Sequence, residues 1–571
     1  MKKIKNHILI ILQIFFFLSI FNGVCAKNFD KFLKSDNINN YFSGILYIQD
    51  NDYANSYKYL KKLKGLEKDH YGYSKIYQYS LVNTGRFEEA FNYSKKLEIE
   101  GLDNFESNLI IAIYYLKNNN FKNAQKYFKK LNQNNSNETL PGFLAESLNI
   151  WSKFMLEDKK INPNLIDGIH NRFKNIKKIQ KTFAYCFSKS PKADLYFKKL
   201  ITNEEINFSR YNFFYANYLN NNKKKLEAIN VINKSLHKYP KNILLNQLKI
   251  DLNTKKINKF NNKFDCTNIS DVVAEIFYVV SNALSSQSLY STSNFYLNLS
   301  KYLNGQFISF DILHAENFYL SGNLTKAKII YNKIKKRGEI YGWYSSKQIA
   351  RILIKQDNQE EALKILEKEF NKLPGSNVYN IYEYADFLKN NKKFKESLIF
   401  FNEVLNTINN QHPLFSKASE GRGVAYERLG NWKKAEQDLL QSLNVKPKQA
   451  YVMNYLAYSW IEKGINIEKS LEMLEEANQI KKNDGYIIDS LGWALFKLQK
   501  YKKAEKHLKK AVILMPSDPV VNDHFADVLW MNSKKIQARY YWNYVLNLKE
   551  AEKELKESIK LKLIFGPKLK I

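Results

Sequence analysis

The sequence predicts an all-α protein, an α-α superhelix of about fourteen helix-pair repeats with a helix that caps its C-terminal end. Three observations predict this fold class. The chain has 571 residues, which is too long for one hydrophobic core. It has only 20 Gly and 10 Pro, so it lacks the turn residues that a large β protein needs. Pairs of small residues twelve positions apart recur along it, at intervals of about 34 or 35 residues.

The small residues are the most regular feature of the repeat. One member of each pair falls in the first helix of the unit, at position eight, and the other in the second helix, at position twenty. Small side chains at these places let two antiparallel helices approach closely, and larger residues around them fill the space. The pairs are Ala315 and Ala327, Ala350 and Ala362, Gly423 and Ala435, Gly492 and Ala504, and Ala526 and Ala538.

Two C-terminal copies carry the rest of the pattern. They hold Gly423, Tyr426, Gly430, Trp432, Ala435, Leu439 and Pro447 in one copy, and Leu491, Gly492, Leu495, Tyr501, Ala504, Leu508, Ala511 and Pro516 in the other. Proline at position thirty-two ends the second helix, because it has no amide donor and clashes with the preceding turn. Position by position, the copies match the tetratricopeptide repeat (TPR), and most of the chain resembles this family. The resemblance implies a right-handed superhelix with an extended concave face that binds proteins.

The repeat pattern divides the chain into four regions. Residues 1–26 are predicted to be a signal peptide, 27–273 divergent TPR-like repeats, 274–552 a regular TPR array, and 553–571 a capping helix with a basic tail. Within the divergent region, the stretches at about 139–208 and 243–273 keep helical periodicity but lose the small-residue pairs.

The capping helix is predicted from a change of pattern near the C-terminal end. Leu555, Ile559 and Leu563 are four residues apart and share one helix face, with charged residues elsewhere. The basic residues of this region, for which we expect solvation rather than a function, are Lys560, Lys562, Lys568 and Lys570.

The first 26 residues indicate export. Lys2, Lys3 and Lys5 precede an apolar stretch, and Val24-Cys25-Ala26 is a small-residue cleavage site, so we expect cleavage after Ala26 and a periplasmic chain without a transmembrane helix. An uncleaved anchor and a lipid on Cys25 are the alternatives. The apolar stretch is shorter than the roughly 20 residues of a spanning helix. The residues before Cys25 lack the Leu-small-small approach of lipoprotein sites.

Cysteine content and charge narrow the function classes. Cys186 and Cys266 are predicted to be buried free thiols rather than a bridge, because secreted proteins that depend on disulfides use more cysteines. The net charge of +33 raises the question of a nucleic acid or an anionic polymer as ligand. Lysine and asparagine are spread along the whole chain, however, which favours a compositional bias over a binding patch.

Three segments near the C-terminal end go beyond a generic repeat, at residues 454–460, 483–493 and 522–530. They resemble a family of exported bacterial TPR proteins. Some of its members are outer-membrane lipoproteins, and one is an adaptor that brings peptidoglycan hydrolases to a carboxyl-terminal processing protease. The resemblance implies a periplasmic scaffold or protease adaptor, while the missing lipoprotein signal leaves membrane anchoring open.

No arrangement of residues indicates catalysis. The eight histidines are scattered, and neither a His-Glu-x-x-His nor a Cys-x-x-Cys motif is present. A phosphate-binding Gly-x-x-x-x-Gly-Lys loop and a Gly-x-Ser-x-Gly elbow are missing too. We therefore expect no enzyme activity, no metal site and no cofactor. His524 lies between Asp523 and Asp527, and we expect a hydrogen-bonded structural histidine there.

The concave face is the predicted site of partner binding. Positions two, five, nine and twelve of the first helix share the face opposite the packing positions. In the last three repeats they include the candidate partner-binding residues Tyr451, Asn454, Tyr458, Tyr486, Asp489, Trp493, Asp523, Asp527 and Trp530. Aromatic residues with carboxylates among them favour a peptide or helical segment with apolar and basic residues. Whether Trp493 and Phe496 bind a partner or pack against the next repeat or the capping helix stays open.

Together these observations predict a non-catalytic scaffold or adaptor of the bacterial cell envelope. It would bind protein partners on its concave surface and present substrates to an envelope protease or an outer-membrane-associated complex. The alternative is a factor for envelope assembly or for cell-wall or polysaccharide export.

Overall fold

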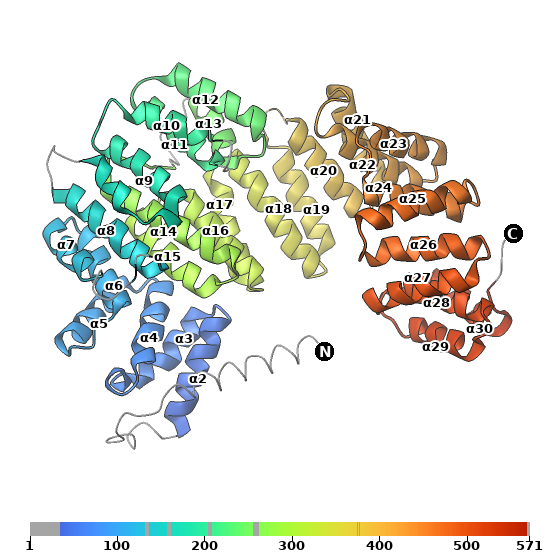
Figure 1. Ribbon diagram of the computed structural model, residues 1–571, viewed down its shortest axis with the longest axis horizontal. Coiled ribbons are helices and arrows are strands. Elements are labelled where there is room, and N and C mark those ends of the chain that lie inside the picture. Colours follow the sequence, from blue (N-terminus) through green and yellow to red (C-terminus); the bar gives the residue numbers. More distant parts are fainter. Residues whose placement is uncertain are drawn as a thin grey trace. The chain divides into compact units, whose positions relative to one another are not determined.

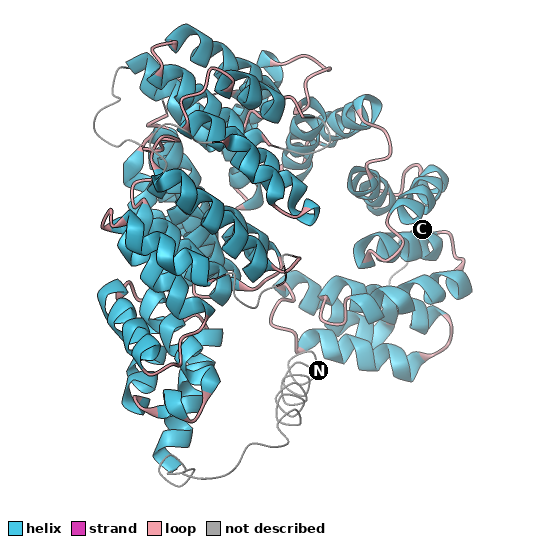
Figure 2. Cartoon of the chain, turned by 60° about the vertical axis from the view of Figure 1, so that its left-hand side comes forward, coloured by secondary structure: helices cyan, strands magenta, loops and turns pink. Residues whose placement is uncertain are grey.

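The computed structural model describes residues 35–131, 136, 138–156, 162–203, 208–254, 262–373, 375 and 377–567. Every regular element in these ranges is a helix, and short loops join the helices (Figure 2). The predicted all-α fold class is therefore confirmed. The predicted signal peptide, with its cleavage site at Ala26, lies outside the described residues, as do Lys568 and Lys570. None of the described helices is long and apolar enough to cross a bilayer.

The chain forms two compact units, which divide after Leu373 (Figure 1). The α-helices of unit 1 are α2 (Ser35–Gln49), α3 (Tyr53–Leu60), α4 (Tyr71–Asn83), α5 (Phe87–Ile99), α6 (Phe105–Lys117), α7 (Phe121–Lys130), α8 (Leu140–Leu156), α9 (Lys174–Phe187), α10 (Ala193–Ile201), α11 (Ser209–Asn221), α12 (Lys225–Lys238), α13 (Ile243–Thr254), α14 (Ile269–Ser286), α15 (Tyr290–Leu303), α16 (Ile308–Leu320), α17 (Leu324–Ile334), α18 (Glu339–Lys355) and α19 (Gln359–Phe370). Short 3-10 helices are η2 (Lys61–Leu63), η3 (Leu66–Lys68), η4 (Pro163–Gly168), η5 (Asn171–Phe173) and η6 (Lys335–Arg337).

Unit 2 contains the remaining helices, and each of them packs against the next one in sequence. They are α20 (Val378–Asn390), α21 (Phe394–Thr407), α22 (Phe415–Arg428), α23 (Trp432–Val445), α24 (Ala450–Glu462), α25 (Ile467–Ile480), α26 (Gly485–Lys497), α27 (Tyr501–Leu514), α28 (Pro519–Met531), α29 (Lys535–Leu546) and α30 (Lys553–Phe565). α30 packs on α29, in the place predicted for the capping helix.

Pairs of successive helices in contact are the building blocks of both units. The described residues form thirteen of them, namely α2/α3, α4/α5, α6/α7, α9/α10, α11/α12, α14/α15, α16/α17, α18/α19, α20/α21, α22/α23, α24/α25, α26/α27 and α28/α29. α8 and α13 have no such following helix among the described residues, and both lie in the stretches that lack small-residue pairs. α14 spans residue 273, where the divergent repeats were predicted to end.

In two of the pairs, α16/α17 and α22/α23, two neighbouring residues set the turn between the helices. Gly322 and Gly430 have φ of +85° and +79° before α17 and α23, a left-handed conformation that glycine adopts without steric cost. Asn323 and Asn431 come next, and their side chains accept a hydrogen bond from the first turn of the second helix. A Gly-Asn dipeptide thus ends one helix and starts the next.

The small residues allow the close helix approach predicted for them. A β-carbon at Gly492 would lie 2.6 Å from Cγ of Leu508, and one at Gly423 would lie 3.1 Å from the carbonyl oxygen of Ala435. Any larger side chain would push the paired helices apart.

Unit 1 also folds back on itself. α15 packs against α4 and α6, α14 against α8 and α9, and α13 against α18, although long stretches of sequence separate these helices (Figure 1). Nδ2 of Asn294 donates to the hydroxyl of Tyr53 over 2.7 Å, and the rings of Phe87 and Tyr302 stack at 4.0 Å. The early helices of unit 1 are therefore covered by later ones. The extended concave face that the resemblance implies is therefore not open over these early helices.

A buried ion pair ties α11 to α14 inside unit 1. Two guanidinium nitrogens of Arg210 donate to the two carboxylate oxygens of Glu275, over 2.8 and 2.7 Å. The same guanidinium lies 3.8 Å from the ring centre of Tyr278. The pair joins helices 65 residues apart in sequence.

Cys186 and Cys266 form a disulfide, with their Cα atoms 5.9 Å apart. The expectation of two free thiols is therefore wrong. Cys186 lies in α9 and Cys266 just before α14, and these helices pack against each other. The packing of α14 on α9 brings the two cysteines together, and no local pattern in the sequence indicates this contact.

Candidate functional site

The inner face of unit 2 consists of positions two, five, nine and twelve of α20, α22, α24, α26 and α28. The residues are Tyr379, Tyr382, Asp386, Lys389, Lys417, Glu420, Val424, Glu427, Tyr451, Asn454, Tyr458, Ile461, Tyr486, Asp489, Trp493, Phe496, Val520, Asp523, Asp527 and Trp530. Six of these side chains are acidic and two are basic, which gives 2 − 6 = −4, in a chain whose net charge is +33. The inner face is thus acidic and aromatic in an otherwise basic protein.

The nine predicted partner-binding residues fall into two groups. Tyr451 and Tyr486 are 55% and 58% exposed, while Asn454, Tyr458 and Trp530 are partly buried. The other four are buried, namely Asp489, Trp493, Asp523 and Asp527. Only the first group offers surface to another molecule.

The buried residues of α26 meet His524 of α28. Nδ1 of His524 lies 2.9 Å from a carboxylate oxygen of Asp489, and its ring stacks on Trp493 at 4.0 Å. Burial lowers the pKa of His524, but the charge and hydrogen bond of Asp489, with the charges of Asp523 and Asp527, hold it above its usual value. A structural histidine was expected at this place, and the geometry agrees. Trp493 packs against the next repeat.

The carboxylates of α28 bind a lysine from the capping helix. Nζ of Lys562 lies 2.7 Å from Asp523 and 2.8 Å from Asp527. Nε1 of Trp542 donates to both carboxylates, over 3.0 and 3.1 Å. Burial and the charge of Asp523 raise the pKa of Asp527 to about 7, against the effect of Lys562. The Lys562 side chain is only 16% exposed, so the expectation that it is solvated is wrong.

α30 thus covers the last repeat of the inner face. Ile559 is fully buried there, with Leu555 and Leu563 partly buried around it. Gly566 abuts the indole of Trp530, which leaves no room for a side chain at position 566. Sequence reasoning missed this arrangement. The available signal was one lysine beside an apolar stripe, together with two aspartates four residues apart on α28.

The uncovered part of the inner face lies on α20, α22, α24 and α26. The Tyr451 hydroxyl donates to Asp484 over 2.9 Å, which fixes its ring at the start of α26. Burial and the charges of Glu462 and Asp489 raise the pKa of Tyr458, so its hydroxyl stays protonated at neutral pH. The amide oxygen of Asn454 is buried and has no hydrogen-bond partner.

Glu420 is a half-buried acid of this face that lacks a partner among the described residues. It forms no hydrogen bond or ion pair with the described residues, although Lys389, Lys417 and Asp386 are near enough to influence it. Burial raises the pKa of Glu420, the two lysines act in the opposite direction, and Asp386 raises it further. Lys389 itself pairs with Asp386 at 2.7 Å.

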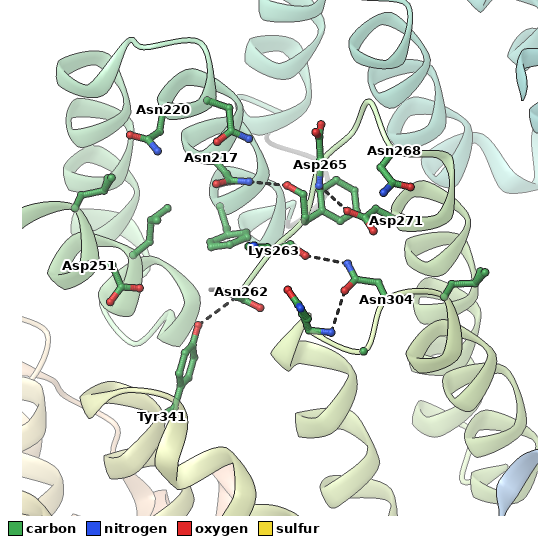
Figure 3. Close-up of a pocket in the computed structure, with 18 of the residues that line it drawn as sticks. Asn217, Asn220, Asp251, Asn262, Lys263, Asp265, Asn268, Asp271, Asn304 and Tyr341 are labelled. Carbon is green, nitrogen blue, oxygen red and sulfur yellow. Dashed lines mark hydrogen bonds between the residues drawn. The ribbon is translucent and has the colours of Figure 1, made fainter. Parts of the chain in front are cut away.

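Unit 1 contains a cavity of about 550 Å³, bordered by α11, α13 and the segment before α14 (Figure 3). Its asparagines are largely used to hold that segment. Asn217 and Asn304 donate to the carbonyl oxygens of Phe264 and Lys263, over 2.8 and 2.9 Å, and Asn262 accepts from the amide of Ile308. The cavity shows no nucleophile with a base beside it. Throughout the described residues, no group of three or more His, Cys, Asp or Glu side chains is placed to hold a metal ion.

Comparison with known proteins agrees with the repeat fold. Residues 344–551 match the family model described as tetratricopeptide repeat. These residues, which run from α18 to beyond α29, are therefore an array of tetratricopeptide repeats, a module that in general acts as a non-catalytic scaffold for proteins.

Among curated relatives, the chain is similar to the TPR repeat-containing protein PA4667 of Pseudomonas aeruginosa. The two are 25% identical over 169 residues, which is 30% of this chain and 28% of the relative's length.

Solved structures with a similar fold include a TPR protein from Parabacteroides merdae, at 18% identity and TM-score 0.38 over 45% of this chain and 98% of that one. The APC/C hetero-tetramer Cut9-Hcn1 is 14% identical, with a TM-score of 0.37 over 92% and 90% of the two chains. These likenesses concern the fold alone.

Proposed function

We propose that this chain is a non-catalytic scaffold or adaptor of the bacterial cell envelope that binds protein partners on the inner face of unit 2. One observation carries the proposal. Tyr451 and Tyr486 stand exposed on successive repeats of the inner face, while Asp489 and Trp493 beside them are buried. Exposed tyrosines in register on a rigid array supply contact area at a low entropic cost.

The chemistry of this face favours a partner segment with apolar and basic residues. The tyrosine rings offer apolar contact, and the half-buried Glu420, which pairs with no cation among the described residues, attracts positive charge. Lys417 is the single lysine of the inner face whose amine is not paired with an acid of that face, beside Glu420 and Glu427. A cluster of cations that would clamp a C-terminal carboxylate is thus not formed by these positions.

The cell envelope is proposed as the location on two grounds. The N-terminal sequence has the pattern of a signal peptide. The Cys186–Cys266 disulfide is a bond that persists in oxidising compartments such as the periplasm. If the proposal is correct, alkylation of thiols in intact cells leaves Cys186 and Cys266 unlabelled until a reductant is added. Full labelling without reductant would contradict it.

The finer role we propose is presentation of substrates to an envelope protease. It is supported by the sequence resemblance at residues 454–460, 483–493 and 522–530. An assembly or export factor of the envelope is the alternative, and the two differ in what they hold. An adaptor is expected to bind a protease and its substrate together, whereas an assembly factor is expected to purify with membrane proteins.

Crosslinked capture from cells tests the binding face. The Tyr451→Ala/Tyr486→Ala double variant should lose its main partner by tenfold or more, because aromatic anchors each contribute about 1 to 3 kcal/mol. Tyr540→Ala/Tyr544→Ala is the matched control, since these tyrosines are exposed on α29, in the second helix of their repeat. Equal capture by both double variants would remove the inner face as the binding site.

A further inference from the structure

The cavity bordered by α11, α13 and the segment before α14 has the size of a small-molecule site. Its volume of about 550 Å³ falls within the range of about 300 to 1,000 Å³ that is usual for such sites. All the described residues that line it belong to unit 1. A ligand in this cavity would therefore contact other residues than the protein partners proposed for unit 2.

The wall that the segment before α14 contributes is fixed by several bonds. Two asparagines, Asn217 and Asn304, donate to its backbone carbonyl groups. The Cys186–Cys266 disulfide bonds the same segment to α9. A cavity with a wall held in this way is formed before a ligand arrives, which lowers the entropic cost of binding.

The lining side chains that a ligand can reach are polar. The exposed lining residues are Asn221, Lys263, Asp265, Asn268, Gly305 and Gln306. The aromatic residues of the lining, Phe213, Phe264 and Tyr341, are buried, as are the leucines except Leu248, which is partly buried. Peptides are held mainly by apolar side chains in apolar pockets, so this lining does not favour a peptide.

Several amide side chains of the lining are not used by the protein itself. Asn220 and Asn221, the last residues of α11, form no side-chain hydrogen bond with another described residue, and Figure 3 shows Asn220 at the edge of the cavity. Asn268 accepts from the amide of Ser270 over 2.9 Å, and its Nδ2 has no partner among the described residues. Each amide has donors beside an acceptor, and each hydroxyl group both donates and accepts, so neighbouring hydroxyls match these side chains.

The charges of the lining nearly cancel. Two lysines and three aspartates line the cavity, namely Lys117, Lys263, Asp251, Asp265 and Asp271, which gives 2 − 3 = −1. Neither sign predominates, although the whole chain has a net charge of +33. The cavity therefore favours an uncharged ligand over an anion.

We propose that this cavity binds a short uncharged saccharide, whose hydroxyl groups bond to the side chains of Asn220, Asn221 and Asn268. Such a ligand is rich in neighbouring hydroxyls, carries no charge and needs little apolar contact, as the lining requires. The proposal goes beyond the function proposed above, because it gives unit 1 a ligand of its own.

Calorimetric titration of the full chain tests the class of ligand. The ligands are maltose and N,N′-diacetylchitobiose, which are uncharged disaccharides. The controls are digalacturonate, an acidic disaccharide, and an alanine tripeptide blocked at both ends. We expect at least one of the uncharged disaccharides to bind at least tenfold more tightly than either control.

Variants without two of the amides locate the contact. Asn220→Ala/Asn221→Ala should weaken binding of that disaccharide by about tenfold, because two hydrogen bonds to the ligand are lost. Asn253→Ala is the matched control, at an exposed position of α13 that does not line the cavity, and it should leave binding unchanged.

A variant that fills the cavity provides a second test. The nearest atom to a β-carbon at Gly305 would be the carbonyl oxygen of Lys301, at an ordinary contact distance of 3.4 Å, so the backbone accepts a side chain there. Gly305→Trp should occupy part of the cavity and weaken binding by more than tenfold, whereas Asn253→Trp should not. Circular dichroism checks that each variant is folded.

Binding of neither uncharged disaccharide would overturn the proposal. Binding of digalacturonate or of the blocked tripeptide with equal or higher affinity would overturn it too. Unchanged binding in Asn220→Ala/Asn221→Ala or in Gly305→Trp would do the same, because the sugar would then lie elsewhere. Each of these results leaves the capture of protein partners through Tyr451 and Tyr486 unaffected.

Discussion

The two units use the same helix pairs but place their inner faces differently. In unit 1, α14 and α15 pack across α4, α6, α8 and α9, so the chain covers its own inner face. In unit 2, the main contacts between described helices join each helix to the next or the next but one, and α30 follows the same rule, because its Lys562 reaches α28. A repeat array that winds back on itself gains stability from distant contacts, and one that does not keeps a surface for partners.

The side chains on the two inner faces reflect this difference. Unit 1 pairs polar groups across distant helices, for example Asn294 with Tyr53 and Arg210 with Glu275. Unit 2 leaves tyrosines exposed on its inner face, at 451 and 486. The stability of unit 1 should therefore depend on single long-range contacts, and the binding of protein partners should depend on unit 2.

Removal of the Arg210–Glu275 ion pair should have the largest effect on the unfolding free energy of unit 1. Arg210→Ala leaves Glu275 buried without a counter-charge, which should cost about 3 to 5 kcal/mol of the unfolding free energy of unit 1. Hydrogen exchange resolved by peptide should show faster exchange in α11 and α14 and none of this change in unit 2.

An exposed pair serves as the control for this prediction. Arg86 and Glu89 are 2.7 Å apart and 44% and 42% exposed, so Arg86→Ala should cost no more than about 1 kcal/mol. Similar losses in the two variants would mean that the buried pair does not hold the fold-back of unit 1.

Removal of the disulfide should have the second-largest effect on the unfolding free energy of unit 1. Cys186 and Cys266 are 80 residues apart in sequence, and a bridge over such a loop typically contributes about 2 to 4 kcal/mol. Cys186→Ala/Cys266→Ala should lower the unfolding free energy of unit 1 by this amount, measured in denaturant. Unit 2 contains no cysteine and is the internal control. A shift of both units together would show that they unfold as one, against the division drawn here.

The part of the fold that the sequence predicted is the part that local contacts determine. Gly492 with Ala504 and Gly423 with Ala435 lie in one hairpin each, so their spacing along the chain fixes their contact in space. The same holds for the turn at Gly430 and for the apolar stripe of α30. Periodicity of this kind needs no knowledge of distant residues.

The remainder depends on pairings that no local pattern encodes. Asn294 and Tyr53 are 241 residues apart, and no sequence feature of either segment indicates that the two are in contact. Lys562 looked like a solvated residue because lysines surround it in the sequence. Lys562 is buried because its amine pairs with Asp523 and Asp527 of α28, which are buried with it. Asp489 and Trp493 are buried by their contacts with His524.

The smallest predicted effect concerns pH and is confined to the end of unit 2. The pKa of Asp527 is raised to about 7, whereas an aspartate in an unfolded chain titrates near about 3.9. The folded state therefore binds this proton more tightly, and the stability that the group contributes is fully present below about pH 4 and is lost as the pH rises through about 7. His524 acts in the same direction, because its pKa is also raised.

Asp527→Asn isolates this contribution. Relative to that variant, the native chain should lose on the order of 1 to 3 kcal/mol of unfolding free energy in unit 2 between pH 4 and pH 7. Glu472→Gln, at an exposed position of α25, should keep the native pH profile, and exchange in unit 1 should show no difference between native chain and variant. An Asp527→Asn profile parallel to the native one would mean that Asp527 is ionised throughout this range, with Lys562 neutralising it fully. In that case a buried ion pair would hold the end of unit 2, as the Arg210–Glu275 pair holds the fold-back of unit 1, and the two units would no longer differ in this respect.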